Sequence, residues 1–227
     1  MKITWLGQAG LLLDTGKTTV MIDPYFSDSV ARVHPENTRR LPIDERFLHM
    51  TPDVLLFTHD HLDHYDPETA PLYFAKEDKQ MTVLCPTSIW QKARLHGGGH
   101  NYVIFDRGTE WTAGDVRLRA VRAQHSEPHA IGVVIEELSS GKAYYVTGDT
   151  LYHVDIFSEL PRDLEAVFFP INGVGNNMNL TDAIRFARQT GAKKLFPLHF
   201  GMFDAIDPAG VKEVGWTVLK PYEKFEL

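Results

Sequence analysis

The segment Thr58-His59-Asp60-His61-Leu62-Asp63-His64 places three imidazoles and two carboxylates within six residues. It directly follows the apolar run Val54-Leu55-Leu56-Phe57, which is typical of a buried strand. The end of that strand is therefore expected to present a cluster of side chains that bind metal ions. Imidazole and carboxylate groups together suit zinc, manganese, iron or nickel.

Further ligand-type residues occur later in the chain, again at the ends of apolar or β-branched runs. The runs 116–121, 143–146 and 194–198 each lead into such a residue. Strands whose ends share one sheet edge bring these side chains close together. A two-metal site needs about three or four protein ligands per ion. The full set of candidate ligands is His59, His61, Asp63, His64, His125, Asp149 and His199.

The rest of the chain is predicted to form strands with helices between them. Expected strands are 2–6, 10–13, 18–22, 54–57, 82–85, 102–105, 110–112, 116–121, 131–136, 143–146, 166–170, 194–198 and 217–219. Expected helices are 66–76, 87–95 and 182–190. Many strands with intervening helices, and ligands only at strand ends, fit an α/β fold of two packed sheets flanked by helices.

Residues 25–50 interrupt this pattern, because they contain prolines and show little periodicity. A connection of this length in a compact domain is usually functional or ordered by its neighbours. The segment could form a lid or an oligomer contact, or it could be a surface excursion.

Composition limits the class of protein. The chain has 227 residues, of which 43% are hydrophobic, so one domain spanning 1–227 is expected. A net charge of −7 gives no general support for nucleic-acid binding. The single cysteine, Cys85, excludes an internal disulfide and is interpreted as a core residue. With no membrane span or signal peptide visible, we expect a cytoplasmic protein acting on a small molecule.

The motif H-x-H-x-D-H after a strand resembles the signature of the metallo-β-lactamase-fold hydrolases. The resemblance covers nearly the whole chain, and four other segments share it: Trp5-Leu6-Gly7, Ile22-Asp23-Pro24, Thr147-Gly148-Asp149-Thr150 and Pro197-Leu198-His199. Among this family, the chain looks like the branch that contains L-ascorbate-6-phosphate lactonase and many uncharacterised metal-dependent hydrolases. The resemblance implies a four-layer αββα sandwich of two mixed sheets, and it makes a homo-oligomer plausible.

The resemblance also implies how the candidate ligands divide between two ions. His59, His61 and His125 match the ligands of the first metal, and Asp63, His64 and His199 match those of the second. Asp149 matches the carboxylate that bridges them. Zinc or manganese is expected, with iron third, and the lactonase resemblance favours manganese somewhat.

The implied reaction is hydrolysis of a lactone, ester or phosphodiester by a hydroxide that bridges the two ions. Asp63 is expected to orient this nucleophile as well as bind metal. His129 and His153 lie within four residues of proposed ligands, so either could protonate a leaving group. Asp23 and Thr150 are candidates for fixing the ligand imidazoles.

Two departures from the branch affect the expected specificity. Gln8 stands where members often have histidine after Trp-Leu-Gly. The loop 171–180 is unusually rich in asparagine, which could set substrate choice or could simply form turns. The remaining histidines are interpreted as surface residues; they are His34, His49, His96 and His100.

Three other functions compete with hydrolysis. The first is an iron-dependent oxidoreductase, similar to persulfide dioxygenases; a mononuclear site would need only part of the seven-residue set. Flavodiiron proteins carry glutamate where this chain has His61, which argues against that relationship. The second is a non-catalytic metal-binding module, which the loss of a ligand would signal, and no ligand is lost. A nuclease is disfavoured by the acidic charge balance.

Overall fold

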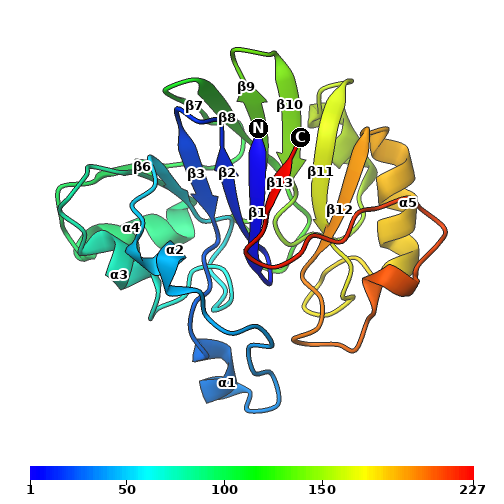
Figure 1. Ribbon diagram of the computed structural model, residues 1–227, viewed down its shortest axis with the longest axis horizontal. Coiled ribbons are helices and arrows are strands. Elements are labelled where there is room, and N and C mark those ends of the chain that lie inside the picture. Colours follow the sequence, from blue (N-terminus) through cyan, green and yellow to red (C-terminus); the bar gives the residue numbers. More distant parts are fainter.

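Two mixed β-sheets, described for residues 1–227 by a computed structural model, form the centre of the molecule (Figure 1). The first contains, in spatial order, β13 (Lys224–Glu226), β1 (Lys2–Gly7), β2 (Gly10–Asp14), β3 (Thr19–Ile22), β4 (Val54–Leu56), β5 (Thr82–Cys85) and β6 (Asn101–Ile104). The second contains β12 (Lys194–Leu198), β11 (Leu164–Pro170), β10 (Lys142–Val146), β9 (Ile131–Glu137), β8 (Val116–Arg122) and β7 (Glu110–Ala113). Strands β3 to β6 run parallel, as do β10 to β12.

The helices lie on the outer faces of these sheets and in the connections. They are α1 (Ser29–Val33), α2 (Glu45–His49), α3 (Ala70–Phe74), α4 (Thr87–Leu95) and α5 (Leu180–Thr190), with the short 3-10 turns η1 (Val154–Glu159) and η2 (Pro208–Gly210). Helices α3 and α4 cover the first sheet, and α5 covers the second (Figure 1). No helix is long and apolar enough to span a membrane.

Alternating side chains explain why each sheet is buried on both faces. In β3, Val20 and Ile22 point into the core of 23 residues between the sheets, whereas Met21 points toward the α3–α4 side. In β10, Tyr144 faces the central core and Tyr145 faces α5. Successive residues of a strand point to opposite faces of the sheet. A strand that is covered on both faces therefore needs apolar residues at successive positions. The predicted α/β architecture of two packed sheets flanked by helices is therefore confirmed.

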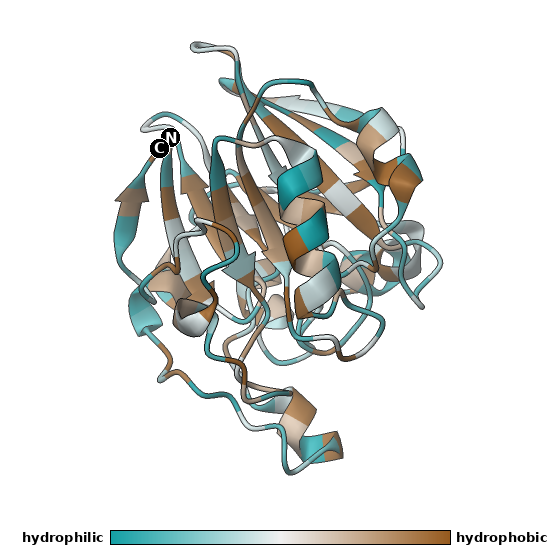
Figure 2. Cartoon of the chain, turned by 90° about the vertical axis from the view of Figure 1, so that its right-hand side faces the viewer, coloured by the Kyte–Doolittle hydropathy of each residue, from teal (hydrophilic) through white to brown (hydrophobic).

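Helix α5 covers the outer face of the second sheet. Asn179 caps it by accepting a hydrogen bond from the Asp182 N–H, and Gly191 ends it in the left-handed conformation. Ala183, Phe186 and other apolar residues of α5 pack on the sheet. Figure 2 faces this helix and shows that it mixes hydrophilic and hydrophobic residues in front of largely hydrophobic strands.

Several elements differ from the sequence prediction. The helix expected at 66–76 is shorter, because Asp66 accepts from the Glu68 N–H and holds the preceding residues in turns before α3 begins at Ala70. The strand expected at 217–219 is absent, although its Thr217 N–H donates to Leu195. The last strand is instead β13, which pairs with the edge strand β1.

The irregular segment 25–50 contains two short helices that were not predicted. Helix α1 projects below the two sheets (Figure 1). Arg39 ties this segment to the body: its guanidinium donates to the carbonyls of Leu6, Tyr25 and Leu41 and to the Tyr222 hydroxyl. The segment is thus fixed beside the strand ends that carry the candidate ligands.

Candidate metal centre

The loop after β4 is shaped so that its histidines and aspartate face inward. The backbone N–H groups of His64 and Tyr65 both donate to the His61 carbonyl, which makes a tight turn. The Thr58 carbonyl accepts from the Ile131 N–H, so the first sheet's loop is joined to the second sheet. His59 and His64 are completely buried as a result.

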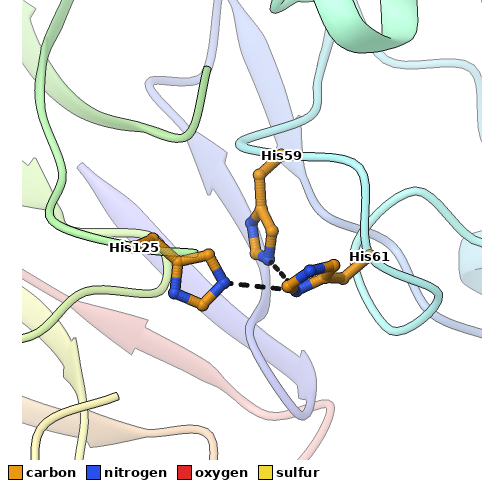
Figure 3. Close-up of side chains that lie close together, drawn as sticks. All are labelled: His59, His61 and His125. Carbon is orange, nitrogen blue, oxygen red and sulfur yellow. Dashed lines mark hydrogen bonds between the residues drawn. The ribbon is translucent and has the colours of Figure 1, made fainter. Parts of the chain in front are cut away.

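Three imidazoles form a first cluster (Figure 3). His59 and His61 come from the loop after β4, and His125 comes from the loop after β8. The Nδ1 atom of His61 lies 3.0 Å from Nε2 of His59 and 3.2 Å from Nε2 of His125. The three ring nitrogens therefore converge on one point.

A second cluster lies beside the first. His199, after β12, has its Nε2 atom 3.0 Å from Oδ2 of Asp63 and 3.2 Å from Nε2 of His64. All three residues are buried. Two imidazole nitrogens and one carboxylate oxygen, all of which can bind a metal ion, thus face one another.

Asp149 lies between the two clusters. Its Oδ1 atom is 3.3 Å from the Nε2 atoms of both His64 and His199, and its Oδ2 atom is 4.0 Å from Nε2 of His59. Gly148 permits this placement, because it has φ +59° and a Cβ there would come within 2.7 Å of the Ile131 carbonyl. Asp149 Oδ1 is buried and has no hydrogen-bond partner.

The outward-facing ring nitrogens are engaged by other groups. The contacts are His59 Nδ1 to Thr58 Oγ1 at 3.1 Å, His64 Nδ1 to Asp23 Oδ2 at 2.7 Å, His125 Nδ1 to the Asn176 carbonyl at 3.3 Å, and His199 Nδ1 to the Asn172 amide at 2.9 Å. A metal-binding histidine commonly donates its other N–H to an oxygen, and His59, His64 and His125 each have such a partner. This leaves their inward nitrogens free to act as ligands. At His199 the partner is the amide nitrogen of Asn172, which donates to Nδ1. Together with the orphaned Asp149 oxygen, the inward nitrogens fit divalent ions that accept nitrogen and oxygen ligands.

Burial and neighbouring charges shift the pKa values of the candidate ligands in opposite directions. Burial holds the pKa of His59 well below its usual value, and the neighbouring His64 adds to this effect. Burial also lowers the pKa of His64, but the carboxylates around it outweigh that and raise it well above the usual value. The pKa of Asp63 falls to about 2 because His64 and His199 outweigh its burial. An ion binding here would therefore displace protons from His64 and His199.

Asp23 acts as an anchor beneath the second cluster. Its Oδ1 accepts from the Thr58 N–H at 2.7 Å, and its Oδ2 accepts from the Thr58 hydroxyl at 2.6 Å and contacts His64 Nδ1. Asp23 is only 1% exposed. This confirms the contact between Asp23 and a ligand imidazole. Thr150, the other candidate, instead uses its N–H to donate to Asn177.

Backbone strain is concentrated around the site. Four of the five non-glycine residues with positive φ are Gln8 (51°), Asp23 (44°), Asn176 (64°) and His199 (57°). Each is a candidate ligand or contacts one. Non-glycine residues in the left-handed region cost of order 1–3 kcal/mol each and tend to occur at functional sites.

The asparagine-rich loop 171–180 contacts the candidate ligands from the second sheet. Asn177 donates from Nδ2 to Asp149 Oδ2 at 2.7 Å, while its Oδ1 accepts from the Thr150 N–H at 2.9 Å. Asn172 contacts His199, and the Asn176 carbonyl contacts His125. These asparagines are therefore more than turn residues, which composition alone did not reveal.

Replacing Asn177 with alanine is expected to weaken metal binding by about 10–100-fold, because Asp149 loses the donor that orients it. A competitive titration with a chromogenic chelator measures this change. Asn101→Ala on the exposed edge strand β6 is the matched control and should leave metal affinity unchanged. Equal affinity in the two variants would show that Asn177 does not position Asp149.

The other residues named from the sequence lie outside the two clusters. His129 lines a polar hollow of about 430 Å³ that the candidate ligand His125 also lines, and its Nδ1 lies 4.0 Å from Asp106. His153 begins η1, where its Nδ1 accepts from the Asp155 N–H. Neither lines the pocket that includes Asp63, Asp149 and His199. Gln8 does reach the site, because its Nε2 donates to Asp63 Oδ2 at 3.2 Å. Cys85 is completely buried, and burial raises its pKa to about 12.

A pocket of about 210 Å³ opens onto the second cluster. His61, Asp63, Asp149 and His199 form its floor. Its walls come from Val30, His34, Leu62, Val174, Gly175 and Phe203. His34, which was interpreted as a surface residue, is exposed and also lines this pocket. No sequence signal connects the segment 25–50 with the strand ends.

Comparison with known proteins gives relatives along the whole chain. The profile of the beta-lactamase superfamily domain matches residues 18–200. A UPF0173 protein of Pyrococcus furiosus is 28% identical, and the match covers all of both chains. A UPF0173 metal-dependent hydrolase of Oenococcus oeni is 26% identical, over 91% of this chain and 88% of the relative.

Solved structures share the fold. A metallo hydrolase from Ignicoccus hospitalis, Igni18, superposes with a TM-score of 0.76 at 18% identity, covering 100% of this chain and 98% of the other. An isothiocyanate hydrolase from Delia radicum gut bacteria superposes with a TM-score of 0.73 at 19% identity, covering 100% and 99%. The superfamily predicted from the histidine motif is confirmed, while the lactonase branch stays a prediction. Since the profile covers most of its length, the chain belongs to the beta-lactamase superfamily.

Proposed function

We propose that this chain is a metal-dependent hydrolase that holds two divalent ions, zinc or manganese, and cleaves an ester, lactone or related bond of a small molecule. The observation that carries the proposal is the complete set of seven nitrogen and oxygen donors, which converge as two clusters with Asp149 between them. The names of the curated relatives and of the metallo hydrolase of the same fold support it.

The donor set supports two ions rather than one. His59, His61 and His125 would hold the first, and Asp63, His64 and His199 the second, with Asp149 shared. A mononuclear iron site of the persulfide dioxygenase type would leave part of this set without a role. When bound, two such ions supply Lewis acidity and a water of low pKa.

The protein's own residues would orient the reacting groups. Asp63 faces both the second cluster and the pocket, and Gln8 holds its Oδ2 atom. Burial raises the pKa of Asp63, but His64 and His199 outweigh this effect and hold the pKa at about 2. Asp63 is therefore ionised at neutral pH. It can therefore accept a hydrogen bond from an attacking water. The buried donors around it keep that arrangement rigid. A role for His129 or His153 as leaving-group acid stays a prediction, since neither lines this pocket.

Metal content is the first test. Mass spectrometry of protein purified without added metal is expected to give about two ions per chain, because the seven ligands divide into two sets. Chelation should abolish hydrolysis of neutral ester and lactone substrates, and zinc or manganese should restore it. One iron per chain with oxygen uptake on a persulfide would replace the proposal with an oxidoreductase. No metal under any condition would refute it.

A further inference from the structure

The walls of the pocket above the second cluster carry no guanidinium or ammonium group. Beyond the four candidate ligands on its floor, the lining is Val30, His34, Leu62, Val174, Gly175 and Phe203. In the adjoining segment 25–50, Arg32 pairs with Glu68 at 2.8 Å, and Arg40 donates from Nε to the Gly201 carbonyl at 3.1 Å. Arg107 and Arg122 line a different hollow, on the side of His125. The walls can therefore contribute packing but almost no countercharge.

The apolar walls are held in place by packing. Val30 of α1 packs with Tyr25 and Met202, and Leu62 and Phe203 pack against this group. The Phe203 ring stacks on His199 with centroids 5.8 Å apart and planes 14° apart. Residues 25–50 thus form one wall of the pocket, which gives that segment a place in the site.

We infer that this pocket selects small, uncharged acyl substrates with an apolar tail, and that it rejects substrates whose tail carries a negative charge. The inference rests on the proposed function. The metal ions would engage the reacting carbonyl, and the tail would lie against Val30, Leu62, Val174 and Phe203. An anionic group on the tail would lie against apolar walls with no cationic side chain to pair with, which disfavours its binding. The volume of about 210 Å³ lies below the ~300–1,000 Å³ typical of drug-sized ligands.

The titratable groups that face the pocket do not change this expectation. They are His34 on the rim, whose Nδ1 lies 4.0 Å from Glu36, and the ligands His61, Asp63, Asp149 and His199 on the floor. The floor groups would be committed to the ions. His34 is exposed to solvent, so any charge it carries is screened.

The test uses two matched probes on the metal-loaded protein. Para-nitrophenyl hexanoate and the mono-para-nitrophenyl ester of adipic acid have the same leaving group and the same carbon chain, but one ends in methyl and the other in carboxylate. The hexanoate ester should be cleaved with a kcat/KM at least roughly tenfold higher. Calorimetric titration with the products should likewise show tighter binding of hexanoate than of adipate.

The decisive variant places a cation on the wall. Val174 is 42% exposed, so Val174→Arg should fold normally. It is expected to reduce or reverse the preference for hexanoate in both assays, by about tenfold, because the added charge can pair with the distal carboxylate. Val154→Arg on η1, 57% exposed and outside the pocket, is the matched control and should keep the wild-type preference.

The outcomes separate this inference from the proposed function. Preference for the adipate half-ester, or faster cleavage of bis(para-nitrophenyl) phosphate than of the hexanoate ester, would overturn the neutral-substrate inference and leave the hydrolase intact. Tighter binding of hexanoate without cleavage of any ester would support the selectivity and count against the hydrolase. Equal preference in Val174→Arg and Val154→Arg would show that these walls do not select the substrate.

Discussion

Asp149→Ala is expected to lower bound metal to one ion or fewer per chain and to reduce kcat/KM by at least roughly a thousandfold. The Asp149 carboxylate approaches both clusters, with its Oδ1 beside His64 and His199 and its Oδ2 toward His59. Without it, each ion loses a ligand and the imidazoles lose the buried negative charge between them. Loss of several kcal/mol of transition-state stabilisation corresponds to a factor of this size.

The control for this variant lies in the same histidine motif. Asp60 follows His59 but points away to pair with Lys92 of α4. Asp60→Ala should therefore retain about two ions per chain and near wild-type turnover. Mass spectrometry for metal and steady-state kinetics on one neutral ester would compare the two variants. Full metal content and full activity in Asp149→Ala would refute a bridging role.

Asp23→Asn is expected to destabilise the protein by about 2–4 kcal/mol and to weaken metal binding by about 10–100-fold. Asp23 accepts from the Thr58 N–H and hydroxyl and contacts His64 Nδ1. In either orientation, the amide of asparagine points an N–H at a donor and leaves buried groups unpaired. His64 also loses the carboxylate that fixes which ring nitrogen faces the second cluster.

Two comparisons separate the local effect from a general one. Asp115→Asn removes a carboxylate that accepts from Thr15 in a turn remote from the ligands. It should lower stability by about 1 kcal/mol and leave metal affinity unchanged. Thr58→Val removes only the hydroxyl, so it should fall between Asp115→Asn and Asp23→Asn in metal affinity. Denaturant unfolding and chelator competition measure both quantities; unchanged metal affinity in Asp23→Asn would contradict the anchoring role.

The sequence predicted that the candidate ligands would lie close together, because they follow a local rule. His59, His125, Asp149 and His199 each come just after an apolar strand, and parallel strand ends meet at one edge. The alternation of buried residues likewise predicts two sheets with a core between them. The position of the candidate ligands and the alternation of buried residues can both be recognised in short windows of sequence. Neither requires knowledge of tertiary contacts.

What the sequence did not predict depends on contacts between distant segments. Nothing near Asn177 indicates that its amide would meet Asp149, because asparagine in a loop is equally suited to a turn. His34 reaches the pocket only because Arg39 fixes its segment to the body. The short strand β13 was missed because its exposed alternation is too brief to show, and it exists through pairing with β1.

The candidate ligands come from two separate sheets, and this affects how readily the protein would unfold. His59, His61, Asp63 and His64 belong to the first sheet's loop, whereas His125, Asp149 and His199 follow strands of the second. The chain has one cysteine and hence no covalent cross-link of its own. Ions bound here would link the two sheets across long chain segments. Because they would bind only the folded protein, they would oppose its unfolding. Under the proposed function, metal availability would then affect the lifetime of the folded protein as well as its activity.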